Sequence, residues 1–224
     1  MPRPTHVALV AQNPGGFTHP AQAEAVRQAG RHLAAAGYAV EEVTPPDLDE
    51  VIETWHRIGS TDFLRVLAPL MEEHGDADAR TSMRLWLELN PPTDMSGVLA
   101  ALAQRDLFLR RWLAFMQRYP LVVMPTMGDL APPHNLNTTR DGKARLLDSA
   151  RVGLISPVLG VPALAVPVGN HGRLRPGVQI WPRASARISA SMPARSSRRR
   201  RASSPRSIQF RNGRPVSAGS DACR

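Results

Sequence analysis

The sequence predicts an α/β protein, in which helices flank a partial mixed sheet, followed by a disordered basic tail. Short apolar runs of strand length alternate with longer segments of helical periodicity, and clusters of Gly and Pro separate them. Charge sets the tail apart: residues 181–224 hold 11 Arg and one acidic residue, whereas residues 1–180 hold 17 basic and 18 acidic residues. We therefore expect a nearly neutral body over residues 1–180 and a separate tail over residues 181–224.

The body begins with a pattern typical of a β-α-β unit. Residues 6–11 form an apolar run that ends in a Gly-rich turn, which predicts a buried strand. Thr18 is the expected N-cap of the next helix, Pro20 fits its first turn, and Gly37 ends it. A second strand over residues 38–43 should run parallel to the first. The turn has neither nucleotide-binding glycine pattern, so we interpret it as a strand-to-helix connection.

Residues 47–90 predict a run of helices. Asp47 followed by Glu50 has the spacing of a capping box, and the helical segments cover residues 48–59, 60–75 and 81–89. The large apolar residues expected to anchor these helices are Trp55, Phe63, Leu67, Leu70 and Trp86.

The longest helix is expected over residues 97–119, where Pro120 stops it. Its apolar face is predicted to consist of Val98, Leu102, Leu109, Trp112, Leu113 and Met116. A buried strand over residues 121–124 follows, then a polar loop over residues 127–143 and a short helix over residues 144–155.

Two further strands complete the predicted body. Residues 163–168 contain a proline, which indicates an edge or irregular strand, and another strand starts at residue 177.

Residue types that carry common chemistry do not fall into recognised catalytic or metal-binding patterns. The seven histidines form neither HExxH nor a pair four residues apart, so we expect no metal site. Cys223 is the single cysteine, which excludes a disulfide framework. Asp148 and Ser149 could serve catalysis, but helix capping uses the same residue types and is the favoured interpretation. We therefore assign no catalytic, cofactor-binding or metal-binding residue and expect no cofactor.

The Gly- and Pro-rich stretch before the tail carries a family resemblance. It contains Gly160-Val161-Pro162-Ala163, then Val166-Pro167-Val168-Gly169, then Pro176-Gly177-Val178-Gln179-Ile180. This order resembles the C-terminal half of the amidase signature family, whose pattern there is N-x-x-G-x-P-A-x-S-V-P-x-G followed by G-L-P-x-G-x-Q-[LI]. The resemblance covers about residues 5–180 and implies the C-terminal portion of the amidase fold and descent from a hydrolase of carboxamides.

Several positions depart from the family pattern. Pro157 stands where the family usually has Asn, Ala165 stands where it usually has Ser, and the Pro-Gly pair is one residue tighter. The family cleaves amides with two serines and a lysine from its N-terminal half, and this sequence contains no corresponding Gly-Gly-Ser-Ser-Gly run. Lys143, the only lysine, is expected in a late polar loop and does not match the family lysine. The resemblance therefore transfers no catalytic residue.

The tail suggests a change of reading frame. Codons compatible with residues 182–211, read in the shifted frame, can encode a segment with helical periodicity that ends in Thr-Pro-Ile-Asp-Pro, similar to the family's terminal helix. The visible tail has neither pattern. We therefore expect a frameshift near codon 181, either genuine or a sequencing error.

Three functional hypotheses follow. The first is a fragment or remnant of an amidase, inactive alone, whose partner would be a separate chain carrying the N-terminal half. The second is a binding module whose tail, through residues 198–201, contacts nucleic acid or anionic surfaces non-specifically. The third is a non-catalytic subunit of an amidase-like or transamidation assembly. No apolar run is long enough to cross a membrane, and the N-terminus does not match a secretory signal, so we expect a cytoplasmic protein.

Overall fold

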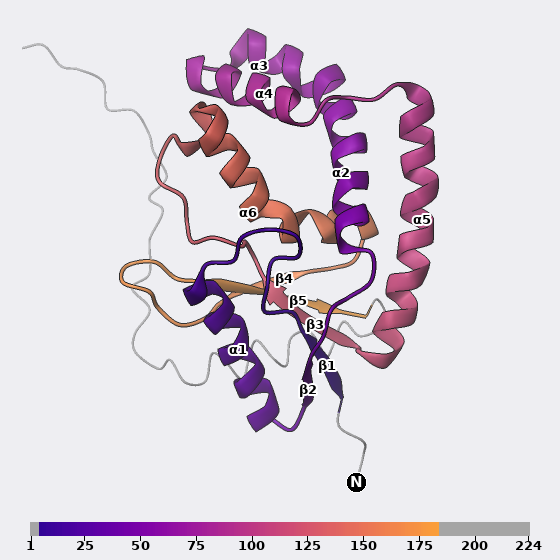
Figure 1. Cartoon of the computed structure of the whole chain (residues 1–224), viewed down its shortest axis with the longest axis vertical. Helices are drawn as coiled ribbons and strands as arrows, with labels where there is room; N and C mark the ends of the chain where they lie inside the picture. Colours follow the sequence, from indigo (N-terminus) through magenta and orange to yellow (C-terminus); the bar gives the residue numbers. More distant parts are fainter. Residues whose placement is uncertain (1–4, 184–224) are drawn as a thin grey trace, which may run out of the picture.

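The computed structural model describes residues 5–183, which form a sheet between helical layers (Figure 1). The expectations of a disordered tail, a frameshift and nucleic-acid contact concern residues that lie almost entirely outside this range. The elements are β1 (His6–Leu9), α1 (Pro20–Ala35), β2 (Ala39–Glu42), α2 (Leu48–Asp62), the π-helical turn η1 (Phe63–Leu67), α3 (Ala68–His74), α4 (Ala77–Leu89), α5 (Met95–Arg118), β3 (Leu121–Pro125), the 3-10 turn η2 (Leu136–Thr138), α6 (Arg140–Leu159), β4 (Leu164–Pro167) and β5 (Gly177–Pro182).

The five strands form one mixed sheet in the order β2-β1-β3-β5-β4. β1 pairs in parallel with β2 and β3, which confirms the predicted β-α-β unit. β5 runs antiparallel to both β3 and β4. The mixed sheet flanked by helices agrees with the predicted fold class.

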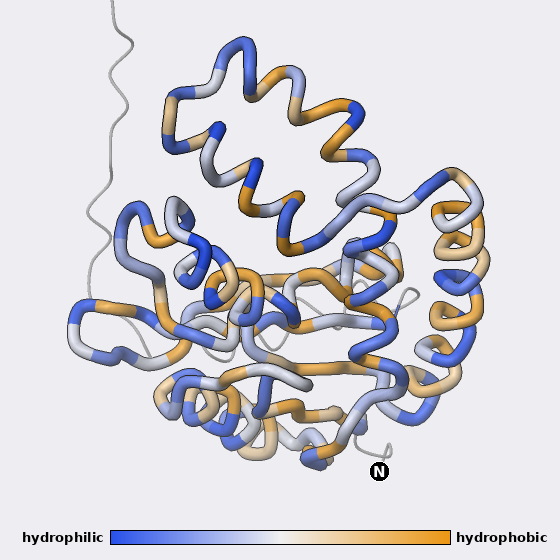
Figure 2. The backbone as a smooth tube through the Cα atoms, turned by 45° about the horizontal axis from the view of Figure 1, so that its top comes forward, coloured by the Kyte–Doolittle hydropathy of each residue, from blue (hydrophilic) through white to orange (hydrophobic). Residues whose placement is uncertain are grey.

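Alternate side chains of the strands enter two apolar cores on opposite faces of the sheet. Val7 and Leu9 pack against α1, whereas Ala8 and Val10 face the side covered by α2, α5 and α6. This alternation follows from the two-residue period of a strand. In Figure 2 the strands run as largely apolar segments through the centre of the molecule.

The N-terminus of α1 differs from the prediction at its cap. His19 is the N-cap, and its Nδ1 accepts a hydrogen bond from the backbone N of Ala21 at 3.1 Å. Thr18, the predicted cap, instead accepts a hydrogen bond from the backbone N of Asn13 at 2.6 Å. Its hydroxyl therefore holds the preceding turn, and the prediction was wrong by one residue.

The capping box predicted at Asp47 is also absent. Asp47 adopts a left-handed conformation with φ of 53°, and its side chain makes no capping hydrogen bond. Its carboxylate instead accepts a hydrogen bond from Arg111 of α5 at 2.9 Å. The Asp47 side chain thus links the start of α2 to α5.

The buried face of α5 is displaced from the predicted one. The side chains of Ala101, Phe108, Trp112 and Met116 are buried, whereas Leu102 is 43% exposed and Leu113 is 36% exposed. The prediction of Trp112 and Met116 is confirmed. The leucine stripe was misplaced because α5 carries apolar residues on more than one face.

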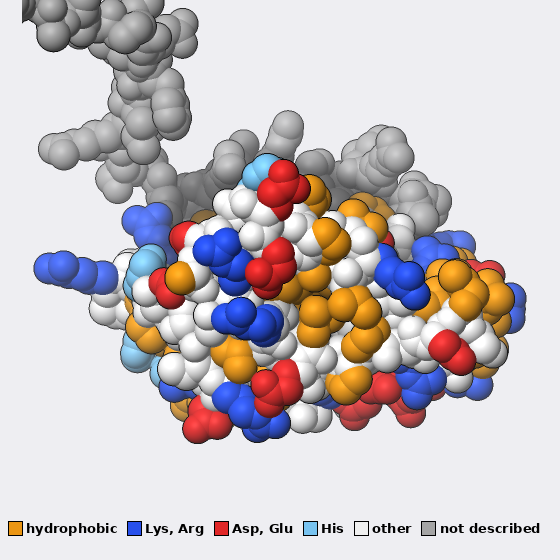
Figure 3. Space-filling model, turned by 90° about the horizontal axis from the view of Figure 1, so that it is seen from above, with side chains coloured by type: hydrophobic (Ala, Val, Ile, Leu, Met, Phe, Trp, Pro, Cys, Tyr) orange, Lys and Arg blue, Asp and Glu red, His pale blue; other side chains and the backbone are white. Residues whose placement is uncertain are grey.

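Leu70, one of the predicted anchors, is 48% exposed. It belongs to a group of exposed apolar side chains on η1 and α3 that also includes Leu64 and Val66. Apolar patches lie among charged side chains on the face seen in Figure 3. By contrast, Phe63 and Trp86 pack with their ring centroids 5.2 Å apart.

α6 is longer than predicted and begins earlier. Thr139 is its N-cap, with its hydroxyl accepting a hydrogen bond from the backbone N of Gly142 at 3.2 Å. Lys143, which was expected in a polar loop, therefore lies in the first turn of α6 and is buried. Pro157 lies inside the helix, and Gly160 ends it with a left-handed φ of 66°.

β5 continues through the expected boundary between body and tail. Trp181 pairs with Val122 of β3, and its side chain is fully buried against Trp112 with the ring centroids 5.5 Å apart. The backbone N of Arg183 donates a hydrogen bond to the carbonyl of Pro120. The folded body therefore includes residues 181 and 182. No helix within residues 5–183 is long and apolar enough to cross a membrane.

Candidate functional site at the carboxyl ends of β1 and β3

Polar side chains gather where the parallel strands β1 and β3 end. Thr126 follows β3, and its hydroxyl donates a hydrogen bond to the carbonyl of Gly177 at 3.1 Å. Gln22 of α1, which is buried, donates to the same carbonyl. In open α/β sheets, ligands bind beside the carboxyl ends of the strands. The start of β5 is thus fixed to β3 and α1 at the edge where a ligand is expected.

The turn after β1 forms the second part of this polar cluster. Asn13 is 2% exposed, and its Nδ2 donates to the carbonyls of Phe17 at 3.1 Å and Asp148 at 2.8 Å. Asp148 in turn accepts a hydrogen bond from the backbone N of Phe17 at 2.9 Å. A carboxylate of the protein therefore already binds a backbone amide of the Gly-rich turn.

Ser149 and Asp129 form the third part. Ser149 Oγ accepts a hydrogen bond from the backbone N of Asp129 at 2.9 Å. Burial alone would raise the pKa of Asp129, but the hydrogen bond and charge of Arg145, with a backbone hydrogen bond, lower it below its usual value. Asp148 and Ser149 therefore both bind loops from the middle of α6. Their position inside α6, whose N-cap is Thr139, shows that the helix-capping interpretation was wrong.

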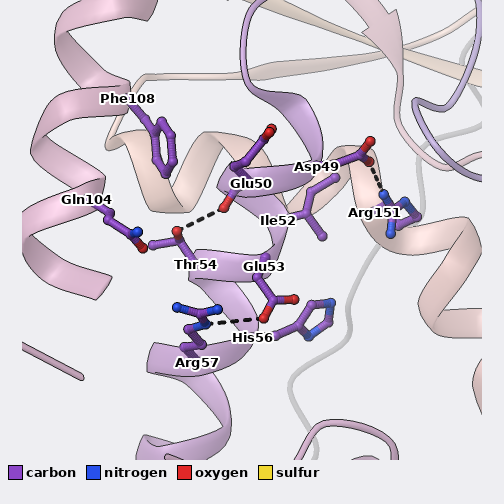
Figure 4. A pocket seen from close by; sticks show the side chains of 10 residues that line it. All are labelled: Asp49, Glu50, Ile52, Glu53, Thr54, His56, Arg57, Gln104, Phe108 and Arg151. Carbon is purple, nitrogen blue, oxygen red and sulfur yellow. Dashed lines mark hydrogen bonds and ion pairs between the residues drawn. The ribbon is translucent and has the colours of Figure 1, made fainter. Parts of the chain in front are cut away.

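A pocket of about 390 Å³ lies beside this cluster, between α2, α5 and α6 (Figure 4). Two ion pairs lie in the wall of this pocket. Asp49 of α2 pairs with Arg151 of α6, and Glu53 pairs with Arg57 at 3.1 Å within α2. The lining residues are Asp49, Glu50, Ile52, Glu53, Thr54, His56, Arg57, Gln104, Phe108 and Arg151.

His56 is the titratable group of this pocket with the clearest perturbation. Burial lowers its pKa, and the positive charge of Arg151 adds to this effect, whereas Glu53 opposes it. Its Nδ1 is buried without a hydrogen-bond partner within residues 5–183.

The chemistry that this pocket can perform is limited. Neither serine nor cysteine lines it, and Thr54 Oγ1 donates to the carbonyl of Glu50 at 2.8 Å. Its lining residues therefore provide no hydroxyl nucleophile activated by an adjacent base. Within the described part of the chain, no group of three or more His, Cys, Asp or Glu side chains could hold a metal ion.

A second pocket, of about 280 Å³, lies between η1, α3, α4 and the start of α6, and we name it the Lys143 pocket. Lys143 is 8% exposed, and its Nζ donates to Ser82 Oγ at 2.9 Å. Burial lowers the pKa of Lys143. The other lining residues are Phe63, Met71, Ala79, Met83, Trp86 and Asn137.

The pairing of Lys143 with Ser82 was missed because Lys143 was expected in a loop. Thr139, three residues before Gly142, carried the N-cap signal that places Lys143 in the first turn of a helix. No local signal joined it to Ser82, which is 61 residues away in the chain.

Comparison with known proteins agrees with this architecture. The family model described as Amidase matches residues 1–192. The chain belongs to the amidase family. The match confirms the resemblance carried by the residues around β4 and β5.

Individual relatives cover much of this amidase-family chain. It is 29% identical over 184 residues to an indoleacetamide hydrolase of Bradyrhizobium japonicum, a match that covers 79% of this chain. Its fold is similar to that of 6-aminohexanoate cyclic dimer hydrolase, with a TM-score of 0.68, 19% identity and 88% of this chain covered. A bacterial aryl acylamidase has a TM-score of 0.65, 16% identity and the same coverage.

The chain spans less than half of the length of these relatives. It covers 38% of the indoleacetamide hydrolase, 45% of the cyclic dimer hydrolase and 44% of the aryl acylamidase.

Proposed function

We propose that this chain is one part of a carboxamide hydrolase and is inactive alone. Membership of the amidase family is the observation that carries the proposal, because the family hydrolyses carbon–nitrogen bonds of amides. The side chains of Asn13, Thr126 and Ser149 at the ends of β1 and β3 form hydrogen bonds with backbone groups, and none of these bonds within residues 5–183 joins a hydroxyl to a basic side chain. Catalysis therefore requires groups from another polypeptide segment.

A separate chain carrying the two serines and the lysine of the family is the partner that fits this role. The sheet supports such a partner, since β4 pairs with β5 on one side and with no other strand within residues 5–183. An edge strand presents backbone donors and acceptors to an additional strand. The edge strand β4 lies 10 to 13 residues before the start of β5 and belongs to the same sheet as β3.

The substrate proposed is an aryl-substituted primary amide. The matching relative is named an indoleacetamide hydrolase, and it shares 29% of its aligned residues with this chain. Indole-3-acetamide and phenylacetamide are therefore the compounds to test first.

Co-expression tests the proposal. The full chain is purified alone and together with the polypeptide encoded immediately before it in the genome, and release of ammonia from indole-3-acetamide is measured. We expect hydrolysis only from the pair. Hydrolysis by the chain alone would show that no second segment is needed, and a stable pair that cleaves neither amide would refute the proposed activity.

Two variants of Ala165 on β4 test whether this strand is the docking edge, one that disrupts the edge and one that serves as its control. Ala165 is exposed on β4, and Ala165→Pro removes one backbone N–H of this edge strand. If β4 is the docking edge and the N–H of Ala165 faces the partner, this variant should lose the pair yet keep its own circular dichroism spectrum. Ala165→Ser should keep both.

A further inference from the structure

We propose that the Lys143 pocket binds an aryl-substituted acetate, with Lys143 as the cationic contact for the carboxylate. This binding site does not depend on the hydrolytic activity proposed above. Three features of the pocket support this binding: a buried cation without an ion pair, a hydroxyl proton free to donate, and apolar walls.

The first observation is a buried cation without an anion. The ammonium group of Lys143 lies 5.4 Å from the centre of the Trp86 ring and donates to Ser82, and it forms no ion pair within the described residues. Neither aspartate nor glutamate lines the pocket. Burial of an unpaired charge is unfavourable. An anionic ligand would supply the missing partner and offset this burial.

The second observation is an excess of donors. Ser82 Oγ accepts hydrogen bonds from Lys143 Nζ and from Asn137 Nδ2, each at 2.9 Å. A hydroxyl has two acceptor lone pairs and one proton, so the Ser82 proton remains available to donate. A carboxylate accepts several hydrogen bonds at once and matches the donors of Lys143 and Ser82.

The third observation is the composition of the remaining wall. Phe63 and Trp86 supply aromatic surfaces, and Met71 and Met83 supply flexible apolar ones. Methionine side chains adapt to ligands of irregular shape and make favourable contacts with aromatic rings. These walls fit the ring of an aryl acetate, whereas a small inorganic anion would leave them without contact.

The single lysine of the chain gives a direct measurement of binding. When lysine labelled with ¹³C at Cε is incorporated into the full chain, Lys143 produces the only lysine signal, because the sequence holds no other lysine. We expect phenylacetate to shift this signal saturably. Phenylacetamide, which has the same shape without the charge, should bind at least tenfold more weakly. Equal binding of the two compounds would overturn the role of the cation.

Two methionine variants test the location of the site by calorimetry. Lys143→Met should weaken phenylacetate binding at least tenfold, whereas Arg84→Met should leave it within twofold. Arg84 lies on the same helix as Ser82, is exposed and does not line the pocket, so its replacement removes one positive charge elsewhere. Equal losses in both variants would indicate only non-specific charge attraction.

A third variant keeps the test decisive if Lys143→Met fails to fold. Ser82→Ala removes the hydroxyl donor and retains the cation, so we expect threefold to tenfold weaker binding of phenylacetate. An unchanged affinity in a folded Ser82→Ala variant would place the ligand outside the pocket. These measurements involve no amide cleavage, so their failure would leave the proposed hydrolysis open to its own test.

Discussion

Replacement of Trp181 by alanine is expected to destabilise the folded body severely. The side chain is fully buried and its Nε1 donates to Gln179 Oε1 at 2.9 Å. Removal of a buried tryptophan costs about 3–5 kcal/mol, and leaving the Gln179 oxygen without its donor adds about 1 kcal/mol or more. We therefore expect the free energy of unfolding to fall by about 4–6 kcal/mol, which is a large part of the roughly 5–15 kcal/mol of a typical domain.

Urea unfolding of the full chain, followed by far-ultraviolet circular dichroism, measures this loss. Trp181→Phe is the matched variant, because it keeps an aromatic ring beside Trp112 and loses the indole donor. It should cost about 1–3 kcal/mol. A Trp181→Ala variant that unfolds within about 1 kcal/mol of the original chain, at an unchanged m value, would refute the inclusion of Trp181 in the core.

Two further predictions concern a titrating group and a helix end. The pKa of His56 is lower in the folded chain than the usual histidine value of 6.5. Below pH 6.5 the unfolded chain therefore binds more protons than the folded chain, and the free energy of unfolding should fall as the pH decreases through 6.5. In urea titrations between pH 5 and pH 8, the free energy of unfolding should change with pH by at most about 1.4 kcal/mol per pH unit. His56→Leu should reduce this slope. An unchanged slope in this variant would assign the pH dependence to another group. Gly160→Ala, at a φ of 66°, should cost about 1 kcal/mol, whereas an unchanged melting temperature would contradict the left-handed end of α6.

The fold was predictable where local pattern and tertiary structure agree. The apolar run at β1, the proline in the first turn of α1 and the apolar run at β3 all predict their elements from neighbouring residues. The residue pattern around β4 and β5 predicted the family, and the family match confirms it. The sequence indicates these features because each depends on a few adjacent positions.

Predictions failed where a distant residue decides the conformation. The residues around Asp47 match the pattern of a helix N-cap, but the Asp47 carboxylate binds Arg111, which is 64 residues away in the sequence. The buried face of α5 depends on which of its several apolar stripes meets α2 and α6, and periodicity alone does not distinguish them. In the Lys143 pocket, Ser82 of α4 and Lys143 of α6 are 61 residues apart in the sequence, so no local motif predicts their contact.

The unequal cover of the two sheet faces has a consequence for local opening. One face is covered by α1, while the other carries α2, α5 and α6, and the two apolar cores share no residue. Detachment of α1 would expose Val7, Leu9 and their neighbours while leaving the opposite core closed. Native-state hydrogen exchange should therefore show the amides of α1 exchanging through an opening smaller than global unfolding, whereas those of β3 exchange only when the whole sheet unfolds.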